Sequence, residues 1–246
     1  MKKTLLAILI FQIITTHINA QENKSEIELD QVELIASPRI EIKNTDNSIS
    51  VLTISREEIQ KSTATNVSEL LQQIAGLDIR RRGAEGMQAD LYIRGGSFDQ
   101  TLLLIDGIKV EDPQTGHHTM NMTLPLEVIE KIEITKGSAG RIYGQNAFTG
   151  AINIITKKDI ENNISLNLTG GSFDQKRAAV TMQRNLKNSD LLINYNRKES
   201  EGYRYNTDFK NDEFFIKSNF KINNQNISAI GAVSYTHLTL PTSSQV

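Results

Sequence analysis

A glycine-rich stretch after a strand-like run is the first place in this chain to look for chemistry. The letters KGSAGRIYGQNAFTG follow the run IEIT, and a strand feeding such a turn is how phosphate-binding loops begin. A Walker loop has a lysine directly after its second glycine, whereas Lys136 precedes Gly137 and Arg141 follows Gly140. The spacing of Gly137, Gly140 and Gly144 also differs from the dinucleotide-binding fingerprint G-x-G-x-x-G. The glycines therefore predict no nucleotide site.

A pair of histidines near two acidic residues is the second candidate. His117 and His118 follow Glu111 and Asp112 in a segment rich in turn formers. Adjacent side chains in an extended loop point apart, whereas zinc ligands are typically four residues apart on one helix face. We therefore expect a ligand-contacting surface loop and no metal site. No serine lies in a nucleophile-elbow motif, so we predict no enzyme, no catalytic residue and no cofactor.

The N-terminus and the composition predict export. Residues 1–20 place two lysines before the apolar run Leu5–Ile14 and end in Ala20, which is the layout of a signal peptide. A membrane anchor would need about 20 apolar residues, and Gln12 interrupts this run. The chain has no cysteine, so disulfides and thiolate chemistry are excluded. With 27 basic and 29 acidic residues, the chain has no net positive charge that would attract nucleic acid.

Residues 21–47 are predicted to form a flexible arm that carries one short strand. The letters LDQVELIA, at residues 29–36, alternate within an otherwise polar segment. An isolated strand cannot satisfy its edge, so it is suited to adding to the sheet of another protein. The alternative is that it forms the first strand of the following domain.

Residues 48–158 are predicted to form a compact domain of helices and strands. Ser55 with Glu58, and Asn66 with Glu69, have capping-box spacing. The dipeptide Asp106–Gly107 is a two-residue hairpin signal. The expected helices are 56–61 and 67–75, with a further turn of helix from Pro125, and the expected strands are 77–81, 89–94, 101–105, 108–110 and 131–135.

Residues 159–233 alternate apolar and polar side chains in runs of about ten residues. Such runs fit tilted transmembrane strands, but a soluble antiparallel sheet with one wet face has the same alternation. The links between the runs alternate between longer and shorter forms, as the loops and turns of outer-membrane barrels do. Residues 234–246 break the alternation and are expected to be an irregular or non-native tail. A genuine fifth strand running into a turn at Pro241 is the alternative.

Ordered motifs between about residues 29 and 158 resemble the plug domain of TonB-dependent outer-membrane receptors. They read SELLQQIAGLDIR, LYIRGG, LLLIDGIKV, LEVIEKIEITKG and RIYGQNAFTGAINIITKK, and ELDQVELIA looks like a TonB box. The resemblance implies an α+β plug with a small mixed sheet and short helices, followed by the first antiparallel strands of a transmembrane β-barrel. A complete barrel of this kind has about 22 strands and a plugged lumen. The chain is then expected to be the N-terminal third of a longer receptor.

By resemblance, such a receptor binds a large nutrient outside the cell and imports it with energy from TonB, ExbB and ExbD. Its surroundings are the lipid of the bacterial outer membrane, and the plug is similar to the cobalamin and siderophore type. The implied TonB box is Leu29, Asp30, Gln31, Val32, Glu33, Leu34, Ile35 and Ala36. The implied plug–barrel contacts are Arg94, Gly95, Gly96, Gly137, Gly144 and Gly150. The expected substrate contacts are Glu85, Met87, Gln88, Gln114, Thr115, His117, His118, Tyr203, Tyr205 and Phe209.

Two further details come from the resemblance. Arg94 matches a family arginine that is salt-bridged to barrel glutamates, which would lie beyond Val246. The glycines of the opening stretch would have a packing role in the plug. The rival hypotheses are a secreted, soluble, plug-like binding module without a barrel and an exported hydrolase, which no motif supports.

Overall fold

The computed structural model describes residues 33–37, 40–43, 51–83, 88–112, 115–117, 119–120, 124–158, 160–222 and 225–238. The chain divides into two units, residues 1–32 and 33–246, and everything below concerns the second. The predicted signal peptide lies outside the described residues, as do these predicted site residues: Leu29, Asp30, Gln31, Val32, Glu85, Met87, Gln114 and His118. In the described part of the chain, no helix has the length and apolarity to span a membrane.

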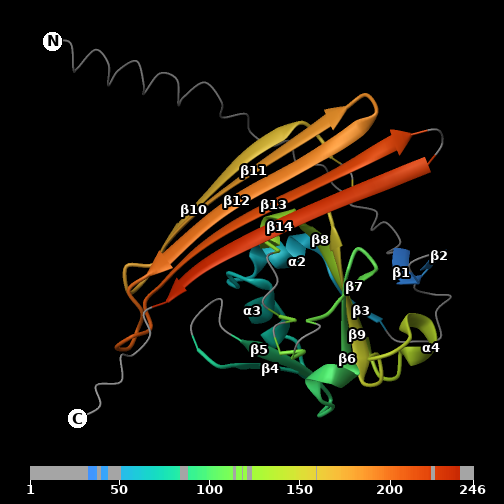
Figure 1. Cartoon of the computed structure of the whole chain (residues 1–246), viewed down its shortest axis with the longest axis horizontal. Coiled ribbons are helices and arrows are strands. Elements are labelled where there is room, and N and C mark those ends of the chain that lie inside the picture. The colour runs from blue at the N-terminus through green and yellow to red at the C-terminus, as the bar shows by residue number, and fades with distance from the viewer. Residues whose placement is uncertain are drawn as a thin grey trace, which may run out of the picture. The chain divides into compact units, whose positions relative to one another are not determined.

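The N-terminal domain is built on a five-stranded mixed sheet with the strand order β3-β8-β9-β6-β7 (Figure 1). Strands β6 and β9 pair in parallel and the other neighbours are antiparallel. A separate antiparallel pair is formed by β4 and β5. The bounds are β3 Val51–Ile54, β4 Leu77–Arg81, β5 Ala89–Ile93, β6 Thr101–Ile105, β7 Ile108–Val110, β8 Ile129–Lys136 and β9 Gly150–Thr156.

Two short helices and three shorter helical segments complete this domain. The predicted capping box closes helix α2, because Ser55 Oγ accepts from Glu58 N and Ser55 N donates to Glu58 Oε2 at 2.7 Å. Helix α3 begins as predicted, with Asn66 Oδ1 accepting from Glu69 N at 2.9 Å. It ends three residues before the predicted Ala75. The bounds are α2 Arg56–Lys61, α3 Val67–Gln72, η2 Phe98–Gln100, η3 Leu126–Val128 and α4 Gly140–Tyr143.

The predicted strands are present, with changes at their ends. Strand β8 is longer than expected, and β5 stops one residue early because Arg94 has a φ of 50° and leaves the extended conformation. The predicted turn between β6 and β7 is confirmed, since Asp106 and Gly107 have φ values of 50° and 78°. The structure also describes a hairpin of two strands, β1 Glu33–Ser37 and β2 Ile40–Lys43.

The glycine stretch packs within the domain, and Gly150 shows why. An added Cβ there would lie 2.8 Å from Ile93 Cδ1 and closer still to the Thr135 carbonyl oxygen, so the backbones of β8 and β9 leave it no room. At Gly140 the nearest atom to an added Cβ is the Ala147 carbonyl oxygen, at 3.8 Å, which is ordinary contact. Only the first of these positions therefore depends on the missing side chain.

We expect Gly150→Ala to lower the free energy of unfolding of the domain by about 1–3 kcal/mol, the usual cost of overpacking a dense interior. Gly140→Ala is the matched control, and it should change the free energy by less than about 1 kcal/mol. The caps, the hairpin signal and the length of residues 45–158 predict that this fragment folds alone. Urea unfolding of the fragment with each substitution measures both values. Equal effects at the two positions would contradict the packing role of Gly150.

The C-terminal part of the chain is one antiparallel sheet of five consecutive strands, β10 to β14 (Figure 1). The register is continuous between each pair of neighbours. Strand β14 runs on to Leu238, which pairs with Phe209, so the alternating strand does not stop at the predicted Val233. The bounds are β10 Asn163–Gly170, β11 Lys176–Leu186, β12 Ser189–Ser200, β13 Phe209–Ile222 and β14 Gln225–Leu238.

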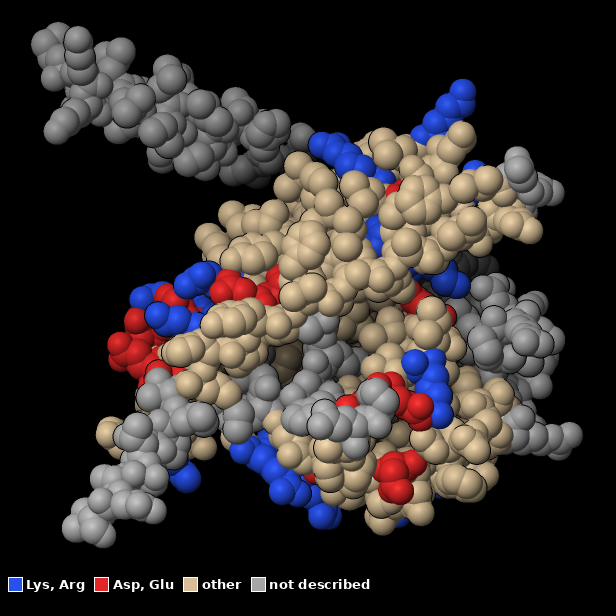
Figure 2. All heavy atoms as spheres, viewed as in Figure 1, with Lys and Arg blue, Asp and Glu red and all other residues tan. Residues whose placement is uncertain are grey.

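In a soluble sheet the buried face is apolar and the exposed face is polar, and this sheet has the reverse arrangement. Its buried face, which packs on the N-terminal domain, is mainly polar and includes Arg177, Thr181, Gln183, Asn194, Asn196, Lys198, Asn211 and Lys217. Its outer face exposes a cross-strand row of apolar and aromatic side chains, Leu166, Val180, Tyr195, Phe214 and Val233. Figure 2 shows a broad uncharged area over these strands, with charged side chains toward both of their ends. The arrangement is that of barrel strands that face lipid outward and a filled lumen inward.

Candidate functional site

Basic side chains on the buried face of the sheet reach acceptors on the N-terminal domain. Arg177 on β11 donates from Nη2 to both carboxylate oxygens of Glu127, at 2.7 and 2.8 Å. Lys198 on β12 is fully buried, and its Nζ donates to the Thr65 carbonyl oxygen at 3.4 Å. Three neighbouring strands thus attach to the domain through a cation each, the third being Lys217 on β13.

The Lys217 contact joins three elements. Its Nζ donates to Asp106 Oδ2 at 2.9 Å and to Thr156 Oγ1 at 2.6 Å. Asp106 also accepts from the Thr156 amide at 2.8 Å and from the Thr156 hydroxyl at 2.7 Å. Thr156 is the last residue of β9, just before the chain passes into the sheet. We call this buried contact between Lys217 and Asp106 the exit ion pair. It holds the β6–β7 hairpin and the end of β9, which we call the exit strand, against strand β13 of the barrel sheet.

Apolar contacts join the same two parts of the chain. Leu192 on β12 and Phe215 on β13 are almost fully buried and belong to the hydrophobic core of the N-terminal domain. Burial of such side chains contributes about 1.5–3 kcal/mol each. The sheet therefore holds the domain through both apolar and charged contacts.

At the end of the sheet where the longer links lie, a hollow of about 740 Å³ opens between the sheet and the domain. We call this the loop end; its links are residues 171–175 and 201–208. The hollow is lined by Thr65, Glu69, Arg81, Gly83, Ser172, Phe173, Gln175, Ser200, Gly202, Tyr203, Thr207 and Phe209. The structure therefore brings two predicted substrate residues, Tyr203 and Phe209, to the same hollow as Gly83 of the domain.

The third predicted aromatic residue, Tyr205, does not line the hollow, and its side chain is 93% exposed. Tyr203 instead packs edge-on against Phe173, with ring centroids 6.4 Å apart. The guanidinium of Arg204 lies 5.2 Å from the centre of the Tyr203 ring. The wall of the hollow at the loop end is thus an aromatic pair flanked by a cation.

The floor of the hollow contains a polar group that the sequence analysis missed. Arg81 Nη1 contacts Glu69 Oε1 at 3.2 Å, and Glu69 Oε2 accepts from both the amide and the hydroxyl of Thr65 at 2.7 Å. Burial acts to raise the pKa of Glu69, but hydrogen bonds from Thr65 and Arg81 outweigh it and lower that pKa. Arg81 Nε is buried and has no hydrogen-bond partner among the described residues.

Two other predicted substrate residues, Gln88 and His117, meet at Asp90 and do not line this hollow. His117 Nδ1 lies 2.9 Å from a carboxylate oxygen of buried Asp90, and Gln88 donates to the same carboxylate at 3.2 Å. The His117 ring packs on Phe98 with centroids 4.2 Å apart, while Thr115 bonds back to its own loop at Asp112. In the described part of the chain, no three or more His, Cys, Asp and Glu side chains are grouped as metal ligands would be.

Only some of the predicted plug–barrel residues lie against other residues of their own domain. Cβ atoms added at Gly96, Gly137 and Gly150 would meet Thr149, Arg94 and Thr135 respectively. Gly95 and Gly144 would meet nothing within 4 Å. The Arg94 side chain is exposed and has no carboxylate partner among the described residues, so its salt bridge with barrel glutamates stays a prediction.

Residues 41–151 match the family model of the TonB-dependent receptor plug domain. This chain carries a TonB-dependent receptor plug. It is 29% identical over 233 residues to the vitamin B12 transporter BtuB of Vibrio vulnificus strain CMCP6, covering 93% of this chain and 36% of the relative. It is 30% identical over 183 residues to BtuB of Vibrio cholerae strain M66-2, covering 73% and 29%. The chain thus spans about a third of the length of the curated relatives it matches.

Solved receptors share the fold of the plug and the strands after it. The pyoverdine outer-membrane receptor FpvA of Pseudomonas aeruginosa, bound to pyoverdine, has a TM-score of 0.68 at 17% identity over 83% of this chain and 30% of its own. The ferric yersiniabactin uptake receptor FyuA of Yersinia pestis has a TM-score of 0.64 at 20% identity, over 77% and 32%. Strands β10–β14 therefore correspond to the start of a receptor barrel. The relatives are transporters and receptors, which agrees with the prediction that the protein is no enzyme.

Proposed function

We propose that this chain is the N-terminal part of an outer-membrane transporter that binds a scarce, large nutrient outside the cell and imports it with energy from TonB. The sheet β10–β14 carries this proposal, because its apolar side faces outward and its polar side holds the plug. A secreted plug-like module would expose that apolar face to water. The proposed location is the bacterial outer membrane, with its lipid against the outer face.

The nutrient enters at the loop end in this proposal. The hollow there presents the aromatic pair Phe173 and Tyr203, which suits a large ligand that has a flat apolar part. The relatives named above transport vitamin B12 or bind the siderophore pyoverdine. Cobalamin and ferric siderophores are therefore the first ligands to test.

The arm supplies the connection to the energy source. The described half of the proposed TonB box, Glu33–Ala36, lies within strand β1. A segment with this strand conformation can add to a sheet edge of TonB, and several main-chain hydrogen bonds loaded together would share the pull. ExbB and ExbD would drive TonB, and the plug would rearrange to let the nutrient pass.

Substitution of the loop-end aromatic residues tests the binding role. We expect Tyr203→Ala and Phe209→Ala in the complete receptor each to weaken ligand binding. The loss should exceed that expected from the buried apolar area alone by about 0.5–1.5 kcal/mol, which corresponds to a further two- to tenfold increase in Kd. Tyr205→Ala is the matched comparison, and its effect should be smaller because that ring lies outside the hollow. Titration of the purified receptor with cobalamin and with a ferric siderophore measures each Kd.

The maximal import rate of bound ligand should be the same in all three variants, because the plug core and the arm are untouched. The competing explanation is that these rings anchor the chain at the membrane interface, where tyrosine is common. Unchanged dissociation constants together with reduced assembly in the membrane would reject the binding role and support anchoring.

A further inference from the structure

The charges that line the loop-end hollow cancel. Among the described residues of its lining, only Glu69 and Arg81 are charged, and they contact each other at 3.2 Å. The pKa of Glu69 is lowered, as described above, so its carboxylate is ionised at neutral pH and balances the guanidinium charge. The described lining therefore has no net charge.

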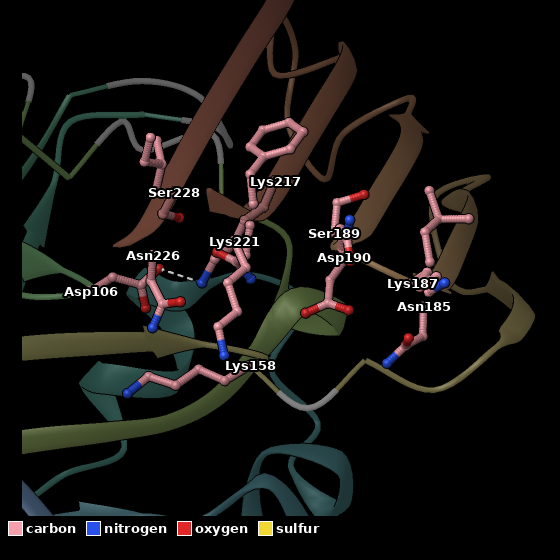
Figure 3. A pocket seen from close by; sticks show the side chains of 15 residues that line it. Asp106, Lys158, Asn185, Lys187, Ser189, Asp190, Lys217, Lys221, Asn226 and Ser228 are labelled. Atoms are coloured by element: carbon pink, nitrogen blue, oxygen red, sulfur yellow. Dashed lines mark hydrogen bonds and ion pairs between the residues drawn. The ribbon is translucent and has the colours of Figure 1, made fainter. Parts of the chain in front are cut away.

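The hollow at the other end of the sheet differs in this respect. It has a volume of about 600 Å³, and its lining includes four lysines and two aspartates, which Figure 3 labels: Lys158, Lys187, Lys217, Lys221, Asp106 and Asp190. A hollow between the plug and this sheet can thus have many charged side chains. The single balanced pair is therefore specific to the loop-end hollow.

The other polar side chains of the loop-end hollow are neutral. Ser172, Gln175 and Tyr203 end in hydroxyl or carboxamide groups that make no hydrogen bond within the described part of the chain. The hydroxyls of Ser200 and Thr207 instead donate to backbone carbonyl oxygens of the two links, at 3.2 and 2.8 Å. Free hydroxyl and amide groups suit the hydroxyl and amide groups of a ligand, but they do not offset the cost of removing water from an ionised group.

The rim of the hollow gives an anion no net attraction either. Residues 171–176 and 201–210 comprise the two links and the residue after the first and two residues after the second. They carry three acidic and three basic side chains, namely Asp174, Glu201, Asp208, Lys176, Arg204 and Lys210. Lys176 pairs with Asp174 at 2.8 Å. The charges of the rim are therefore balanced, like those of the lining.

We infer that the loop-end hollow selects an uncharged ligand. The pairing of Glu69 with Arg81 keeps the site neutral, which makes Glu69 a specificity-determining residue. Ser172 and Gln175 bond to amide or hydroxyl groups of the ligand, and the aromatic pair contacts its flat part. This inference rests on the proposed function, because it names the class of nutrient. It favours cobalamin, which carries peripheral amides, over strongly anionic ferric siderophores.

Titration of the purified complete receptor with cyanocobalamin and with a ferric tris-catecholate chelate, a strong anion, tests the inference. We expect cyanocobalamin to bind at least about tenfold more tightly, because the chelate would lose hydration without gaining a cation. The Kd for cyanocobalamin should change by less than about twofold between low and high salt, because no net charges meet.

Glu69→Gln should shift this preference toward the anion, because it leaves the Arg81 charge unbalanced. We expect the ratio of the chelate Kd to the cyanocobalamin Kd to fall by about tenfold. Glu201→Gln is the matched control, since it removes the same charge from an exposed position that does not line the hollow. The ratio should then change by less than about twofold. Gln175→Lys adds a cation without altering the plug and should also lower the ratio, with Gln175→Met as its neutral control.

Circular dichroism of each variant shows whether it is folded, and Gln175→Lys provides the test if Glu69→Gln is not. A chelate that binds the unsubstituted receptor as tightly as cyanocobalamin does would overturn the inference and leave the transporter proposal intact. An unchanged ratio in Glu69→Gln and Gln175→Lys would do the same. Saturable binding of neither compound would overturn the nutrient role of the hollow, and this inference with it.

Discussion

Replacement of Lys217 by methionine should free the exit strand from the barrel wall. Asp106 would keep its two bonds from Thr156, but its part-buried carboxylate would lose its ion pair with Lys217. Removing one member of a buried ion pair typically costs about 3–5 kcal/mol, because the other charge is left uncompensated. At about 1.4 kcal/mol per tenfold change, the Thr156 amide should exchange with solvent about 10²- to 10³-fold faster.

Hydrogen exchange followed by mass spectrometry or NMR measures this effect at the peptide that contains Thr156. Lys210→Met is the control, since it makes the same change on the same strand at an exposed position. The double variant Asp106→Asn/Lys217→Met should recover part of the protection, because it leaves no buried charge unpaired. Thr156 exchange that is equal in Lys217→Met and in the control would show that the exit ion pair does not hold the strand.

Val32→Pro should abolish uptake while leaving ligand affinity unchanged. Proline has no N–H to donate and bends the chain, so a strand centred on this residue loses a hydrogen bond to any sheet edge that it joins. The change is far from the loop-end hollow in sequence, so binding of the nutrient should persist. Uptake of labelled ligand by cells and titration of the purified receptor measure the two quantities separately.

Asn23→Pro tests whether any proline in the arm has this effect, because it lies before the proposed TonB box. Uptake should be close to normal in that variant. Normal uptake by Val32→Pro would refute the assignment of residues 29–36 as the TonB box, and would leave the plug and barrel assignments as they are.

Local signals predicted much of the fold. Capping residues at Ser55 and Asn66 marked two helix starts, because their side chains satisfy amides of the first turn whatever the rest of the chain does. Alternation placed Thr181 and Val180 on opposite faces of β11, and Lys217 and Phe214 on opposite faces of β13, as the structure has them. Period-two patterning fixes the two faces of a strand but does not say which face meets water.

The polarity of the sheet and the contacts of its buried face required the structure. The sequence analysis did not single out Arg177, Lys198 or Lys217, since their partners are distant in the chain and no spacing rule connects them. The Arg81–Glu69 pair was missed for the same reason. One signal could have identified Arg177, Lys198 and Lys217. Each is a basic residue among neutral polar residues on the strand face that meets the plug.

The strand order of the plug sheet has a consequence for how the protein is made. Val51 in β3 pairs with Thr135 in β8, and Thr101 in β6 pairs with Gly150 in β9. Neither pair can form until the later strand has been synthesised, and domains dominated by such non-local pairing fold slowly. Strands β3 and β6 therefore lack these partners until β8 and β9 have been made, although β4 and β5 can already pair with each other. The same delay exposes the plug's apolar strands to aggregation, so a chaperone would have to protect them during that interval.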